Sequence, residues 1–242
     1  MRKSFIVCAI IYDIDISFIT IDHAMPRSDP KRPQFQTPFS THLQQGRESL
    51  RKGERTRLDL LQSAMDYLAE HSLDGLTVAE ICQRTGVAHG TFYLHFKDRH
   101  ALVQELLRLF VDYLQQQMLA AAREPGDPVR NSTANYFYLF KAHAGLMKCL
   151  VIGMDAFPEA RAAFHQLNHQ WANIVARAHS KDTRDPTDKA EILRRTYALG
   201  GMVDQYLTAL FVTADPWLAD VSSDDDAVIN TLTNLWKRGM QI

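Results

Sequence analysis

One short stretch, residues 77–96, constrains the fold of this chain more than any other. Its sequence is TVAEICQRTGVAHGTFYLHF. Thr77 is a suitable N-cap residue, and Glu80 follows it at the spacing of a capping box. Leu76 and Ile81 occupy the positions of a hydrophobic staple around the same start. We therefore predict that a short helix begins directly after Thr77.

Gly86 marks the end of this helix, because glycine readily adopts the left-handed conformation that terminates helices. Val87 is expected to fill the angle of the turn, and a second short helix is expected from about Ala88 to Leu94. Two short helices joined by a tight turn form a unit that can lay its second helix in the major groove of DNA.

The leading end of the second helix carries small or polar residues, which allow the backbone to approach base edges closely. We expect His89, Gly90 and Thr91 to lie nearest the bases. Tyr93 and His95 follow at positions from which side chains can reach phosphate oxygens. The stretch is thus a candidate helix-turn-helix motif.

Helices are predicted on both sides of this motif. Apolar residues recur at helical spacing from Leu61 to Leu68, which indicates an amphipathic helix ending near His71. Asp98 is a suitable N-cap for a long helix that runs to about Arg123. Lys97 stands directly before that start, where anions are also favoured.

The first fifty residues differ from the rest and are expected to form a flexible N-terminal extension. An isoleucine-rich run, Phe5–Ile21, follows a basic start. It resembles a signal peptide in outline, but its uninterrupted apolar part is short and no small-residue cleavage site follows. The alternative is an upstream extension, with Met25 as the natural start. Residues 26–57 are rich in Arg, Lys and Pro, which indicates either solvated disorder or a basic arm that seeks phosphates.

Composition excludes several function classes. The chain has 27 basic and 28 acidic residues, so its net charge does not indicate a polyanion partner. Its three cysteines are widely spaced, which favours reduced thiols in a cytoplasmic protein over disulfides or a metal site. No apolar run is long enough to span a membrane. No catalytic pattern is present, so we do not expect an enzyme, a cofactor or a bound metal ion.

The chain beyond residue 107 is helical by pattern and contains many aromatic residues. Asp127 and Pro128 mark one helix start, and another helix is expected near Pro158. Aromatic residues at helical spacing usually belong to a core, but they can also line a ligand pocket. The candidate pocket residues are Tyr136, Phe140, His143, Met147, Phe164, Trp171, Met202 and Tyr206.

The last two predicted helices carry more apolar surface than one domain needs. Residues 189–213 are apolar over more than one face, and Gly200 and Gly201 would allow another helix to approach closely. Residues 224–238 form the final amphipathic helix, whose acidic start suits the positive end of the helix dipole. We expect these two helices to form a homodimer interface.

Residues 54–107 closely resemble the N-terminal domain of TetR-type transcriptional regulators. The resemblance is carried by the contiguous run from Thr85 to Phe96 and by TVAEI at residues 77–81. It implies an all-α fold in which a three-helix DNA-binding domain, residues 51–107, precedes an effector-binding and dimerisation domain, residues 108–242. It also implies an apolar ligand cavity in the second domain.

The resemblance further implies roles for single residues. Thr77 would cap a helix whose start holds a phosphate, Thr91 and Tyr93 would contact the DNA backbone, and Lys97 would pair with a phosphate. Two positions depart from the usual pattern, because Ala88 replaces a frequent capping serine and His89 replaces a frequent Lys or Arg.

The combined prediction is a ligand-responsive repressor that binds a palindromic DNA operator as a homodimer. Its effector would be a small and largely apolar molecule. The alternative is a chromosome-organising protein of the same fold that regulates no promoter.

Overall fold

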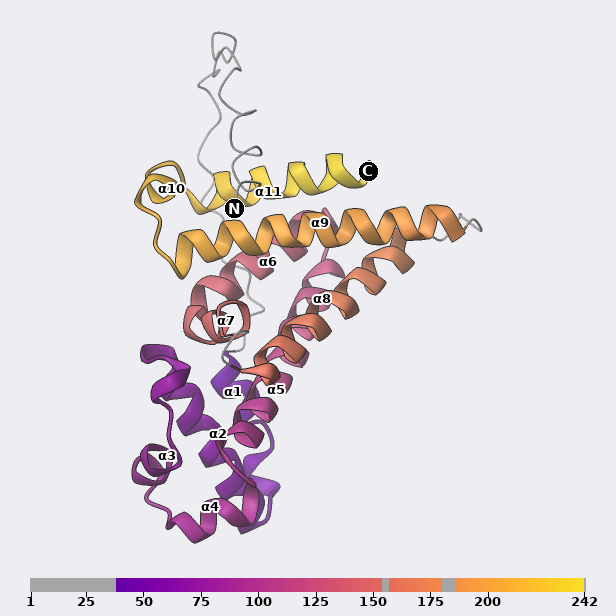
Figure 1. The fold of residues 1–242 in the computed structure, drawn as a ribbon. Coiled ribbons are helices and arrows are strands. Elements are labelled where there is room, and N and C mark those ends of the chain that lie inside the picture. The colour runs from indigo at the N-terminus through magenta and orange to yellow at the C-terminus, as the bar shows by residue number, and fades with distance from the viewer. Residues whose placement is uncertain (1–37, 154–156, 180–185, 242) are drawn as a thin grey trace, which may run out of the picture. The chain divides into compact units, whose positions relative to one another are not determined.

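The computed structural model describes residues 38–153, 157–179 and 186–241, and these residues form helices and the turns between them (Figure 1). The fold is all-α, with a helix-turn-helix domain followed by a larger helical domain. The first part comprises α1 (Phe39–Leu43), α2 (Lys52–Glu70), α3 (Val78–Thr85) and α4 (His89–His95), with short 3-10 turns at Arg47–Ser49 and Leu73–Gly75. The second comprises α5 (Arg99–Ala122), α6 (Pro128–Ala142), α7 (Ala144–Val151), α8 (Pro158–His179), α9 (Pro186–Phe211), α10 (Pro216–Val221) and α11 (Asp225–Met240).

The expected boundaries of the helix-turn-helix are confirmed. The Thr77 hydroxyl accepts a hydrogen bond from the Glu80 amide at 3.1 Å, and Leu76 and Ile81 are both fully buried. Gly86 ends α3 in the left-handed conformation with φ of 69°. The capping box is only half formed, because the Glu80 carboxylate pairs with Arg84 at 2.5 Å.

Residues 38–50 differ from the flexible extension that was expected of them. They form α1 and a 3-10 turn, and the Phe39 side chain is fully buried. Its ring lies 5.1 Å from the rings of both Phe110 and Tyr113. The physical reason is that a single large aromatic side chain can anchor a short segment even where its neighbours are polar. The run Phe5–Ile21 and Met25 lie outside the described residues.

Two arginines of the basic stretch also have partners within the protein. Arg47 forms a bidentate ion pair with Asp59 on α2, at 2.8 and 2.9 Å. Arg57 forms a bidentate pair with Glu105 on α5. Residues 47 and 57 are therefore not part of a free basic arm.

α5 is the central helix of the described chain. Its N-cap is Asp98, whose carboxylate accepts a hydrogen bond from the Ala101 amide at 2.8 Å. The helix runs through the domain boundary expected at residue 107 and packs against α2, α6 and α8. Ten of its side chains are buried, which makes it the spine shared by both parts of the fold.

α6 and α11 begin at residues that the sequence indicated. Asp127 accepts hydrogen bonds from the amides of Val129 and Arg130, with Pro128 at the first helical position. Asp224 caps α11 in the same way. Two short helices, α7 and α10, complete the larger domain.

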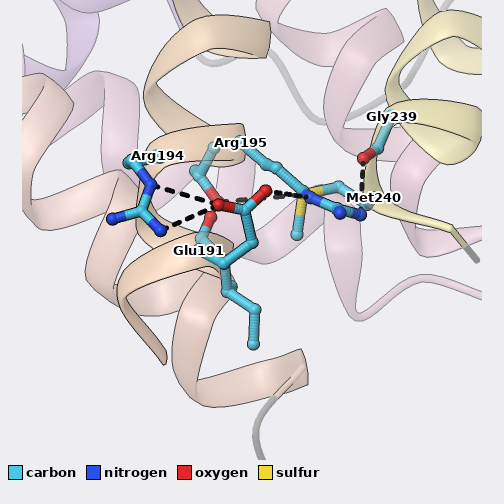
Figure 2. A network of polar contacts seen from close by, with 7 residues as sticks. Glu191, Arg194, Arg195, Gly239 and Met240 are labelled. Atoms are coloured by element: carbon cyan, nitrogen blue, oxygen red, sulfur yellow. Dashed lines mark hydrogen bonds and ion pairs between the residues drawn. The ribbon is translucent and has the colours of Figure 1, made fainter. Parts of the chain in front are cut away.

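α9 and α11 lie side by side, as Figure 1 shows in orange and yellow. Figure 2 shows how the first half of α9 is fixed to the end of α11. Glu191 binds Arg194 and Arg195, and the Arg195 guanidinium donates to the Gly239 carbonyl oxygen at 3.4 Å. A methyl group at Gly239 would lie 2.7 Å from a Leu199 side-chain carbon, so the two helices are in close contact.

Candidate functional site

The leading end of α4 is open to solvent. His89 and Gly90 are exposed, and a side chain at Gly90 would meet no other atom within 4 Å. Ala88 precedes the helix without a side-chain cap, as the sequence led us to expect. The first turn of α4 therefore presents small and polar groups that another molecule can approach closely.

The rest of α4 divides into a buried and an exposed face. Phe92 is fully buried and Phe96 is 3% exposed, so both side chains pack inward. Tyr93 is 56% exposed, and its ring stands edge-on to that of Phe92 at 5.4 Å. Leu94, which the sequence analysis did not single out, is 82% exposed. The apolar face thus anchors α4 in the protein core, whereas the opposite face is exposed to solvent.

The remaining predicted contacts lie around this face. Thr77 is exposed at the start of α3, and Thr91 is half-buried on α4. The Lys97 side chain is 87% exposed, with Asp98 3.9 Å away as a weak partner. His95 lies beside the start of α2, where a methyl group at Gly53 would come within 3.8 Å of its ring.

The first turn of α2 adds positive charge to the same region. Arg51, Lys52 and Arg55 are all exposed and have no ion-pair partner among the described residues. Gly53, in the middle of this group, is the residue that lies against His95. The sequence placed these residues in a basic stretch, but only the fold brings the start of α2 next to α4.

Arg99 has a different role from that of Lys97. Its guanidinium donates to the Leu76 carbonyl oxygen at 2.9 Å and lies over the Phe157 ring. Arg99 therefore connects the start of α5 to the turn before α3, and a phosphate would have to compete with these contacts.

A second site is a cavity of about 370 Å³ in the larger domain. Its walls come from α5, α6, α8, α9 and α11, and most of the lining side chains are apolar. The lining residues are Met118, Leu119, Ala122, Pro128, Val129, Ser132, Thr133, Tyr136, Leu167, Asn168, Trp171, Ile174, Val175, Ala178, Gly200, Val203, Asp204, Trp236 and Met240.

Two of the eight candidate pocket residues, Tyr136 and Trp171, line this cavity. The other six lie elsewhere. Phe140 and Met147 are fully buried in the core, and His143 packs edge-on against Phe110 at 5.5 Å. Burial lowers the pKa of that histidine. The Tyr206 hydroxyl shares a 2.7 Å hydrogen bond with Ser222, and Phe164 and Met202 are partly buried against the core.

A buried, hydrogen-bonded pair of a tyrosine and an aspartate is the main polar feature of the cavity. The Tyr136 hydroxyl donates to a carboxylate oxygen of Asp204 at 2.7 Å, and each residue is 7% exposed. Burial raises the pKa of Asp204 to about 6, although the hydrogen bond from Tyr136 opposes this. Burial and the adjacent carboxylate raise the pKa of Tyr136 well above its ordinary value. Asp204 is not among the pocket residues expected from the sequence.

Two further observations concern the described residues alone. None of their helices is both long enough and apolar enough to cross a membrane. Within the same ranges, no group of three or more His, Cys, Asp or Glu side chains is arranged to hold a metal ion.

The fold and the two sites define a class: all-helical proteins in which a helix-turn-helix domain precedes a larger helical domain with a cavity. Residues 60–106 match the family model of bacterial regulatory proteins of the tetR family. The repressor KstR2 of Mycolicibacterium smegmatis is 39% identical over 72 residues, which are 28% of this chain and 35% of that protein. The chain therefore spans about a third of the length of this relative.

Two other known regulators resemble the chain over most of their length, one in sequence and one in fold. The regulator EthR of Mycobacterium tuberculosis is 23% identical over 209 residues, which are 80% of this chain and 91% of EthR. The structure of FadR from Bacillus subtilis in complex with stearoyl-CoA has a TM-score of 0.58 at 18% identity, covering 75% of this chain and 98% of that one. Residues 60–106 therefore form a tetR-type domain, and the described chain shares its overall fold with known regulators of that type.

Proposed function

We propose that this protein is a ligand-responsive transcriptional repressor that binds a palindromic DNA operator as a homodimer. The observation that carries the proposal is the exposed leading end of α4, held by a buried face within a tetR-type domain. Two kinds of relative support it. KstR2 is described as a repressor, and FadR was solved with stearoyl-CoA bound.

In the proposed complex, α4 enters the major groove. His89, Gly90 and Thr91 face the base edges, where the missing side chain of Gly90 permits close approach. Tyr93 and Lys97 contact the phosphate backbone, which fixes orientation without reading sequence.

Additional phosphate contacts come from the first turn of α2. Arg51, Lys52 and Arg55 are exposed and unpaired among the described residues, and they flank Gly53, which lies against His95. In this complex a short basic surface on an ordered helix makes the phosphate contacts, in place of the basic arm that the sequence allowed. Each phosphate contact made by such a side chain contributes to the salt dependence of binding.

The homodimer is proposed to form through α9 and α11. Tyr197 is 46% exposed and Leu235 is 44% exposed, although both are large apolar side chains. A side chain at the exposed Gly201 would meet nothing within 4 Å, so this part of α9 has room for another helix. A two-fold axis between such surfaces would place two recognition helices on successive turns of a palindrome.

Ligand response is proposed to follow from the position of the cavity. Gly200 and Asp204 of α9 and Trp236 of α11 line it, so both helices of the proposed dimer interface also contact its contents. A ligand that fits only one arrangement of the dimer would shift the population between states that can and cannot bind DNA.

Selection from random duplex DNA followed by fluorescence-anisotropy titration tests the proposal. We expect a selected palindrome with half-sites about 10 bp apart, or a multiple of that distance, and two chains bound to each duplex. Lys97→Ala should lower the slope of log K against log salt by about one unit per chain, whereas Lys148→Ala on α7 should not change it. Recovery of no common sequence, with equal affinity for all duplexes, would refute sequence-specific regulation.

Genome-wide binding separates the repressor from the alternative of a chromosome-organising protein. Binding at one or a few promoter palindromes is expected of the repressor. Many dispersed sites without promoter preference would favour the alternative instead.

A further inference from the structure

Asp204 is an uncommon residue for the wall of an apolar cavity. It is 7% exposed, and one of its carboxylate oxygens accepts the Tyr136 hydroxyl at 2.7 Å. Its second oxygen receives no hydrogen bond from the residues that the structure describes. A buried carboxylate is costly unless it is paired with a cation or fully hydrogen-bonded. Part of the hydrogen-bonding capacity of Asp204 is therefore left for a molecule inside the cavity.

The cavity provides no cation for this carboxylate. Of the described residues that line it, none is Lys, Arg or His, and Asp204 and Tyr136 are the titratable ones. An anionic head group, such as a carboxylate or a phosphate, would meet an acidic group there without any positive charge to bind it. Because like charges repel strongly in such an environment, anionic ligands are disfavoured.

Two indole rings give the cavity a second, independent preference for a cationic ligand. Trp171 of α8 and Trp236 of α11 line the same cavity as Asp204. The faces of aromatic rings attract cations, and tryptophan does so most strongly. A carboxylate together with tryptophans is a side-chain set that suits an ammonium group.

We propose that the cavity binds a lipophilic amine, with its ammonium group on the free oxygen of Asp204 and its apolar body against the remaining walls. The volume of about 370 Å³ lies at the lower end of the range for small-molecule pockets, so one small ligand fills it. The inference rests on the proposed effector-responsive function for its biological meaning, but the binding itself can be tested separately. It also distinguishes this chain from the FadR structure, whose bound stearoyl-CoA carries anionic phosphates.

Four probes, each with a chain of ten carbon atoms, test which head group the cavity prefers: decylamine, decyltrimethylammonium, decanol and decanoate. Binding to the full chain is measured by isothermal titration calorimetry and tryptophan fluorescence in the absence of DNA. Decylamine is expected to bind about 10- to 100-fold more tightly than decanol, because a hydrogen bond to a charged group is stronger than one between neutral groups. Decyltrimethylammonium, which cannot donate a hydrogen bond, should fall between them, and decanoate should bind most weakly.

Substitution of Asp204 then tests whether this residue causes the preference for the amine. Asp204→Asn should remove most of the preference for decylamine over decanol, whereas Asp220→Asn, at an exposed position on α10, should retain it. Far-UV circular dichroism establishes that both variants are folded. If Asp204→Asn fails to fold, the order of the four probes on the parent protein still decides the inference.

The outcomes separate this inference from the proposed function. An amine preference that depends on Asp204 supports the inference, even if decylamine does not release DNA. In that case it is the ligand-responsive function that fails. Decanoate binding as tightly as decylamine, or no binding by any of the four probes up to their solubility, overturns the inference and leaves specific DNA binding untouched.

Discussion

Replacing Asp204 by asparagine should stabilise the protein, and the gain should grow as the pH rises. Asparagine has nearly the same shape and keeps an oxygen that accepts the Tyr136 hydroxyl, but it carries no charge. Burial raises the pKa of Asp204 from 3.8 to about 6. A carboxyl group with a raised pKa in the folded state favours folding while it is protonated. It loses that contribution as the pH rises through the folded-state pKa.

The size of the effect follows from the pKa shift. A shift of about 2 units corresponds to about 3 kcal/mol over the whole titration. In the unfolded chain the Asp204 carboxyl group is already mostly ionised at pH 5. About 1.4 kcal/mol of the change therefore remains between pH 5 and pH 8. The free energy of unfolding of Asp204→Asn, minus that of the parent, should therefore increase by about 1.4 kcal/mol over this range.

Urea unfolding monitored by circular dichroism at pH 5, 6, 7 and 8 measures this difference at one fixed protein concentration. Asp220→Asn is the matched control, and its difference from the parent should stay constant across the same range. A difference for Asp204→Asn that does not change with pH would refute the reasoning. So would a variant that is less stable than its parent at pH 8, because then the buried charge would be compensated within the protein.

Three other predictions concern the framework. Thr77→Ala removes the cap of α3 and should lower the free energy of unfolding by about 1 kcal/mol, measured by urea unfolding; an unchanged midpoint would contradict the cap. Gly145→Ala would place a methyl group 2.3 Å from the Leu68 carbonyl oxygen, so α7 must move away from α2. We expect thermal unfolding to show a loss of about 1–3 kcal/mol, and an unchanged stability would contradict the close contact. Phe39→Ala should cost about 3–5 kcal/mol in the same assay, whereas a segment that behaves as a flexible arm would lose nothing.

Local signals made the helix-turn-helix predictable. The start of α3 depends on Thr77, its end depends on Gly86, and α5 begins after Asp98, and each of these acts through atoms a few residues away. Such contacts are encoded in short stretches of sequence, so that their spacing is sufficient to predict them.

Long-range packing was less predictable. α1 was missed because Phe39 lies in a polar, proline-containing segment, and only the aromatic side chains of α5 explain its burial. Of the pocket candidates, Tyr136 and Trp171 face the cavity, while Phe140 lies in the core one helical turn beyond Tyr136. Periodicity identifies an apolar stripe but does not say which of its members surround a void.

Asp204 illustrates the same limit. It lies in a helix whose apolar residues indicated an assembly surface, and an isolated acid there reads as a solvent-facing position. Its burial follows from the packing of α9 against α6, which brings the Tyr136 hydroxyl within 2.7 Å. The sequence signal that could have identified it is its place directly after Val203, which shares an apolar helical face with Leu207.

The central claim is that the first turn of α4 reads a DNA sequence, and the specificity ratio tests it most directly. This ratio compares the affinity for the selected palindrome with that for a scrambled duplex at one salt concentration. We expect the parent to show a ratio of at least about 10³, and His89→Ala and Thr91→Ala to reduce it about tenfold or more. Gln116→Ala, at an exposed position on α5, should leave it unchanged. A ratio near one for the parent, or a ratio that neither α4 substitution alters, would contradict the claim.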